Sequence, residues 1–171
     1  MSIGDWEKLN GSKNIFSLEQ IDLIRNVLVA VDGSENSDRA LDFTLDFAEK
    51  YNATVTVLNV SESPAMGVVP IEPTNVSGES MVMIAKDLQR IHEDILTKAV
   101  AHAREVKPNV SVSSKLREGD PASEIVAEAK ENGVDVVVVG HRGLSKVREI
   151  FLGNISAKVA HLAPCPVIIV R

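Results

Sequence analysis

Short aliphatic runs alternate along this chain with longer stretches in which apolar residues recur every three or four positions. The aliphatic runs predict β-strands at 27–31, 54–60, 110–116, 134–139 and 167–170. The helical spacing predicts helices at 40–48, 84–103, 122–131 and 155–162. Such alternation of strand and helix is typical of a parallel sheet whose right-handed crossovers place helices on both faces. The pattern therefore predicts an α/β fold.

Residues with strong local preferences mark where these elements begin and end. Ser34 follows the first strand and suits a helix cap, as does Asp120, with Pro121 at the first helical position. Pro108 ends the long helix, and a short helix is expected near 145–151. The stretch 61–80 contains three prolines, two glycines and no clear period, which predicts a long loop. The run 110–116 alternates apolar and polar residues, which favours a strand near a sheet edge.

The chain's most informative segment begins with the run 134–139, whose only polar residue is Asp135. A strand this apolar is expected to be buried on both faces. It leads into Gly140-His-Arg-Gly143, then nine residues, then Gly153-Asn-Ile-Ser156. Glycines after a strand let a ligand approach the backbone, and a helix N-terminus attracts phosphate. The spacing predicts a nucleotide phosphate site supplied by Gly143, Gly153, Asn154 and Ser156.

Ligands of such sheets bind beyond the carboxyl ends of the strands, where the strand order reverses. If the first strand lies beside the fourth, Asp32 and Gly140 face each other there. Asp32 can then accept hydrogen bonds from ribose hydroxyls, and Val60, at the end of the second strand, can contact a base. Arg142, Lys146 and Arg148 form a basic cluster nearby that suits phosphate.

Each of these features also has a purely structural interpretation. Asp32 before a glycine is a common turn residue, glycines after strands often only make turns, and the basic cluster could be an ordinary solvated face. Neither the dinucleotide motif Gly-x-Gly-x-x-Gly nor a P-loop Gly-Lys-Ser/Thr occurs. The full glycine spacing at a strand-to-helix junction is the more specific signal, and it favours phosphate binding.

Composition narrows the class of protein. The chain has 171 residues, enough for one domain, and a net charge of -6, which argues against binding nucleic acid or an anionic membrane. It has no membrane-length apolar run and no secretory signal at its start, so a cytoplasmic location is expected. Its one cysteine, Cys165, is interpreted as a small packed residue. Residues 1–25 are expected to form an N-terminal extension, and 26–171 the domain.

The histidines give no catalytic pattern. His92 and His102 lie ten residues apart in the long predicted helix, too far apart to share a metal ion on one turn. His141 lies inside the glycine loop and is the one histidine placed to touch a ligand. No carboxylate pair or Ser-His-Asp arrangement is apparent, so no catalytic residue is assigned.

Three motifs together resemble the universal stress protein family: NVLVAVDGS at 26–34, the spacing from Gly140 to Ser156, and APCPVIIV at 163–170. The resemblance covers about 25–171. It implies a five-stranded parallel sheet of order 3-2-1-4-5, a Rossmann-like fold of the adenine nucleotide alpha hydrolase type. It also implies ATP as the ligand, because members with this glycine spacing typically bind it.

The resemblance implies the residues that contact ATP, with Mg²⁺ or Mn²⁺ held by the phosphates and no metal ligand from the protein. Asn154 stands where the family commonly has Ser or Thr, and its amide is expected still to donate and to cap the helix. The nucleoside is expected near Ala30, Val31, Asp32 and Val60, and the ribose and phosphates near Val139, Gly140, Arg142, Gly143, Gly153, Asn154, Ile155 and Ser156.

The first functional hypothesis is an ATP-binding, homodimeric regulator of a stress response, in which the nucleotide biases the loop 61–80. The strand 167–170 is expected to lie at the sheet edge and to pair with a second copy, as in the family. An unidentified protein partner is implied. The alternatives are a slow ATP hydrolase or phosphotransferase, since the family does not require turnover, and a nucleotide-free dimeric adaptor.

Overall fold

A parallel five-stranded sheet of order β3-β2-β1-β4-β5 forms the centre of the molecule, as predicted. The computed structural model describes residues 24–62, 78–143 and 153–171. The predicted helix near 145–151, Lys146, Arg148 and most of the expected extension and loop lie outside these ranges. The strands are β1 (Asn26–Ala30), β2 (Thr54–Ser61), β3 (Val112–Glu118), β4 (Val136–Gly140) and β5 (Val167–Val170).

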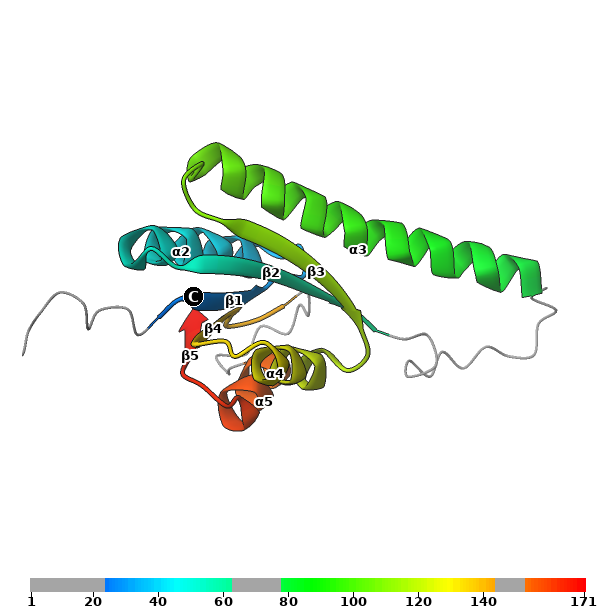
Figure 1. Cartoon of the computed structure of the whole chain (residues 1–171). Coiled ribbons are helices and arrows are strands. Elements are labelled where there is room, and N and C mark those ends of the chain that lie inside the picture. Colours follow the sequence, from blue (N-terminus) through cyan, green and yellow to red (C-terminus); the bar gives the residue numbers. More distant parts are fainter. Residues whose placement is uncertain (1–23, 63–77, 144–152) are drawn as a thin grey trace, which may run out of the picture.

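Helices cover both faces of this sheet (Figure 1). On one face, α2 and α3 enclose a core that includes Val29, Leu41, Leu45 and Val57. On the other face, α4 and α5 enclose a second core. One end of α3 extends well beyond the sheet (Figure 1). The helices are α2 (Glu35–Tyr51), α3 (Gly78–Val106), α4 (Pro121–Glu131) and α5 (Asn154–Leu162).

The strands β3 and β4 begin two residues later than their apolar runs predict. The Val110 N–H donates to the Lys107 carbonyl at 3.0 Å, and the Val134 N–H donates to the Ala129 carbonyl at 3.0 Å. Both valines therefore belong to the turns that end the preceding helices. The helix α3, in contrast, begins earlier than predicted, at Gly78 inside the stretch predicted as loop.

The predicted caps of α2 and α4 are confirmed. The Ser34 Oγ accepts from the Ser37 N–H at 3.2 Å. The Asp120 Oδ1 accepts from the N–H and the hydroxyl of Ser123, at 3.0 and 2.7 Å. These two bonds lower the pKa of Asp120, the hydroxyl contributing most.

The strands β3 and β5 are the two edges of the sheet, as expected for 110–116 and 167–170. The Pro166 carbonyl, just before β5, accepts from the Val137 N–H of β4 at 3.0 Å, and the Val170 carbonyl accepts from the N–H of His141, just after β4, at 2.7 Å. Because backbone groups alternate in direction along a strand, those of Val167 and Ile169 point toward the open edge.

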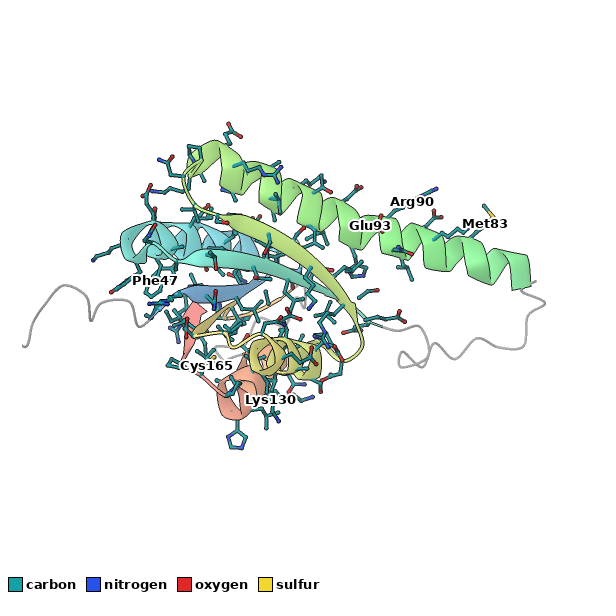
Figure 2. The ribbon with its side chains drawn as sticks, in the orientation of Figure 1. Phe47, Met83, Arg90, Glu93, Lys130 and Cys165 are labelled. Atoms are coloured by element: carbon teal, nitrogen blue, oxygen red, sulfur yellow. The ribbon has the colours of Figure 1, made fainter. Side chains whose placement is uncertain are left out.

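Cys165 lies close to β5, half-buried against the core under α4 and α5, and burial raises its thiol pKa (Figure 2). None of the described helices is both long and apolar enough to cross a bilayer.

Candidate nucleotide site

The site begins with the turn that follows β1. The strands β1 and β4 are neighbours, with Ala30 opposite Val139, so their carboxyl ends meet as predicted. The Val31 N–H donates to the Leu58 carbonyl of β2 at 2.9 Å. The Ser34 N–H donates to the Asp32 Oδ1 at 3.0 Å, which closes a tight turn around Gly33 at φ 81°. The turn fixes the Asp32 carboxylate at the carboxyl end of β1.

Gly143 brings the loop after β4 against this carboxylate. A Cβ atom on Gly143 would overlap the Asp32 Oδ2. The two predicted halves of the crevice therefore touch, and residue 143 has room for no side chain while Asp32 keeps this position.

Gly140 lies closely against α2. A Cβ atom at Gly140 would lie 2.9 Å from the backbone carbon and oxygen of Asn36, in the first turn of α2. The backbone that approaches Gly140 closely is thus the protein's own helix. Gly140 is explained by packing between β4 and α2.

Two of the predicted phosphate donors are already engaged. The Gly153 N–H donates to the His141 carbonyl at 2.8 Å, and a Cβ at Gly153 would lie 3.0 Å from that oxygen. The Ser156 hydroxyl, 4% exposed, donates to the Gly140 carbonyl at 2.7 Å. Gly153 and Ser156 therefore hold the start of α5 against the end of β4.

The N-terminus of α5 has backbone donors that the helix itself does not satisfy. The first intrahelical bond runs from the Ala157 N–H to the Gly153 carbonyl, so helix geometry leaves the amides of Asn154, Ile155 and Ser156 without an intrahelical acceptor. Asn154 does not cap the helix, contrary to the expectation: the N-cap is Gly153, which has no side chain, and Asn154 follows it as the first helical residue.

This helix start differs from those of α2 and α4. Both of those have a capping side chain and an acidic residue in the first turn, Glu35 in α2 and Glu124 in α4. The first turn of α5 has neither. The positive end of its dipole is therefore the one, among these three, that no anionic side chain of its own turn offsets.

The remaining predicted residues border this region in different ways. Ala30 and Val60 are half-buried and pack on the α4 and α5 side of the sheet, and Val139 is buried there. Arg142 is half-buried in the loop after β4, and Ile155 is 40% exposed at the start of α5. His141 is half-buried, and its Nδ1 is buried without a hydrogen-bond partner among the described residues.

Sequence reasoning missed Asn59, which is 1% exposed near the end of β2. Its Nδ2 donates to the Val31 carbonyl at 2.7 Å, and its Oδ1 lies 2.6 Å from the His92 Nδ1. The available signal was a single amide side chain within the apolar run 54–60, since such a residue is retained in a buried strand only when it is hydrogen-bonded.

Two cavities lie apart from these residues. One, of about 260 Å³, is lined by polar residues of β3 and α4 such as Ser113, Lys115 and Glu128. The other, of about 350 Å³, lies between the ends of β2 and β3 and the first half of α3, at Ser61, Leu88 and Leu116. Neither lining includes a predicted site residue.

Comparison with known proteins places the chain in a family. The sequence model described as the universal stress protein family matches residues 23–171, and the chain belongs to this family. The universal stress protein YxiE of Bacillus subtilis is 35% identical over 155 residues, which cover 87% of this chain and 100% of that protein.

Solved structures of this family share the fold. The universal stress protein UspA from Lactobacillus plantarum superposes with a TM-score of 0.70 at 20% identity, covering 86% of this chain and 97% of that one. A universal stress protein solved in complex with cAMP has a TM-score of 0.61 at 26% identity, covering 86% and 96% of the two chains.

Proposed function

We propose that this protein binds ATP at the carboxyl ends of β1 and β4 and acts as a homodimeric regulator of a stress response. The observation that carries the proposal is the start of α5, whose backbone amides and positive dipole end, not offset by an anionic side chain of its own first turn, lie beside the loop that touches Asp32. The related protein in complex with cAMP supports an adenine nucleotide as the ligand class.

Different residues contact different parts of the nucleotide. Asp32 accepts hydrogen bonds from the ribose, while Ala30, Val31 and Val60 border the base. The amides of Asn154, Ile155 and Ser156, with Arg142 and Gly143, receive the phosphates. The end of β4 and the start of α5 are kept in place around the phosphates by Val139, Gly140 and Gly153. Mg²⁺ or Mn²⁺ binds together with the phosphates.

The test is direct binding to the whole chain. Protein purified without added nucleotide is denatured, and the released small molecules are identified by mass spectrometry. Stripped protein is then titrated calorimetrically with ATP and with GTP. ATP binding that is at least tenfold tighter than GTP binding supports the proposal. Stripped protein that gives no heat with ATP contradicts it.

One observation favours a second candidate, the nucleotide-free dimeric adaptor. Gly140 and Gly153 are both explained by contacts within the protein, so part of the glycine spacing does not require a ligand. Under this alternative, Gly153→Val lowers stability and changes nothing else. Under ATP binding it also abolishes the calorimetric signal, because it displaces the start of α5 from the His141 carbonyl.

The dimer uses β5 in this proposal, and the location is cytoplasmic. Steady turnover of ATP by the purified protein, at about 1 s⁻¹ or faster, would instead favour a hydrolase or phosphotransferase.

A further inference from the structure

A chain of hydrogen bonds connects α3 to the turn that carries Asp32. The His92 Nδ1 of α3 lies 2.6 Å from the Asn59 Oδ1 of β2. The Asn59 Nδ2 donates to the Val31 carbonyl at 2.7 Å, one residue before Asp32. Asn59 is almost wholly buried, so water does not compete for its amide.

The bonding partners fix the direction of each bond. The Val31 carbonyl can only accept, so the Asn59 amide must turn its NH₂ group toward it and its oxygen toward His92. That oxygen can also only accept, so the His92 Nδ1 must carry a proton. Neutral His92 is therefore the Nδ1–H tautomer.

A second contact ties α3 to the same turn. Gly33, at φ 81°, faces Ile95, and a Cβ there would lie 3.3 Å from the Ile95 side chain. His92 and Ile95 are three residues apart and so lie on one face of α3. The helix therefore contacts the turn on both sides of Asp32: at the Val31 carbonyl through Asn59, and at Gly33 directly.

We propose that Asn59 and His92 are positioning residues, through which the placement of α3 sets the affinity of the nucleotide crevice. This inference rests on the proposed function. Asn59 precedes Val60, the expected base contact, and bonds to Val31, so one side chain holds the ends of two strands that border the base. A shift of α3 that breaks the His92 bond leaves a buried amide oxygen unpaired and loosens both strand ends.

The test compares substitutions at His92 in the full chain. His92→Leu removes the donor, whereas His92→Asn keeps one close to the position of Nδ1. His102→Leu is the matched control: His102 is on the same helix, and its Nε2 also makes a 2.6 Å contact, but with Asp42 on α2, and both side chains are about half exposed.

The expected result is a loss of ATP affinity of about tenfold in His92→Leu, with His92→Asn within about threefold of the parent protein and His102→Leu unchanged. Without nucleotide, the amides of Val31 and Ser34 should exchange with deuterium about tenfold faster in His92→Leu than in His102→Leu. Equal affinity and equal exchange in these two variants would overturn the proposal.

The unaltered protein supplies an independent measurement. Nitrogen-15 NMR of neutral His92 should show a protonated Nδ1 and an unprotonated Nε2, and the opposite tautomer would also overturn the proposal. Exchange and tautomer are both measured without nucleotide. If the parent protein binds no ATP, they therefore still decide whether His92 positions the turn, and only the proposed function fails.

Discussion

At the residue scale, the three glycines that join β4 to α5 serve different purposes. Gly140 lies against the backbone of α2, Gly153 against the His141 carbonyl, and Gly143 against the Asp32 side chain. The spacing predicted that the three glycines act together. It could not show what each one contacts, because the neighbours (Asn36, Asp32 and His141) lie far from the glycines in sequence. Of the three, only Gly143 would place an added side chain directly against Asp32, a residue predicted to bind the ligand.

Gly143→Ala should therefore weaken ATP binding by at least about tenfold while the protein stays folded, because the new Cβ displaces the Asp32 carboxylate. Calorimetric titration with ATP and a thermal unfolding curve measure the two effects.

Gly133→Ala is the control for Gly143→Ala. Gly133 has φ 57° and nothing within 4 Å of an added Cβ, so this substitution costs about 1 kcal/mol of stability and leaves ATP affinity unchanged. If both variants bind ATP as the parent does, Asp32 does not hold the ribose.

At the scale of elements, apolar periodicity predicted every described strand and helix, and the capping preferences of Ser and Asp predicted the caps Ser34 and Asp120. The prediction began β3 and β4 too early. Val110 and Val134 have β-branched side chains that favour strands, but both lie in turns. The cap of α5 was predicted wrongly because Asn154 is a good capping residue, yet the chain turns one residue earlier, at Gly153. The Asn59 to His92 bond could not be predicted, because it depends on where α3 packs.

The cap of α4 gives a prediction with a defined pH dependence. The folded-state pKa of Asp120 lies below its ordinary value, so its carboxylate stabilises the fold above about pH 4 and this contribution is lost as the pH falls through the folded pKa. Asp120→Ala should cost about 1 kcal/mol of unfolding free energy at pH 7, and less at pH 3. Urea unfolding at the two pH values measures it, and a cost that is larger at pH 3 would contradict the assignment.

The contact between β3 and α4 depends on an ion-pair cluster. Arg117 of β3 bonds to Glu124, Glu128 and Glu131 of α4 at 2.6, 2.8 and 2.8 Å, which raises its pKa and lowers that of Glu131. The Glu128 side chain is only 3% exposed and also bonds to Lys115 at 2.7 Å. Removing Arg117 leaves this buried carboxylate with Lys115 as its one cationic partner within the described residues.

Arg117→Leu should therefore lower the unfolding free energy by about 2 kcal/mol. Arg39→Leu, which breaks the exposed 3.4 Å pair with Glu35, should cost less than about 0.5 kcal/mol. Chemical denaturation of both variants makes the comparison. Equal costs would mean that Glu128 finds sufficient solvation without Arg117.

At the scale of the whole molecule, the two open edges of the sheet are unlike. The edge strand β3 contains Ser113, Ser114, Lys115 and Arg117, whereas β5 is four aliphatic residues, all half-buried. An apolar edge with outward backbone groups favours pairing with a second copy, and a charged edge opposes it. The difference favours β5 over β3 as the interface of the proposed dimer.

Ile169→Pro should make the protein monomeric, because it removes an N–H that points to the open edge and places a ring where a second strand would pair. Ser114→Pro, on the outer side of β3, is the matched control and should remain dimeric. Sedimentation velocity distinguishes the two states. A dimeric Ile169→Pro variant would place the interface elsewhere.

Because the protein's single cysteine is partly buried next to β5, the reactivity of this thiol can measure local opening at that edge of the sheet. Thiolate reacts with disulfide reagents and the thiol does not, so the raised pKa and partial burial of Cys165 slow labelling in the folded state. Labelling then reports how readily the segment that leads into β5 opens and exposes this thiol. A labelling rate that is far faster than global unfolding would reveal a local fluctuation at this edge, measured without adding any probe to the chain.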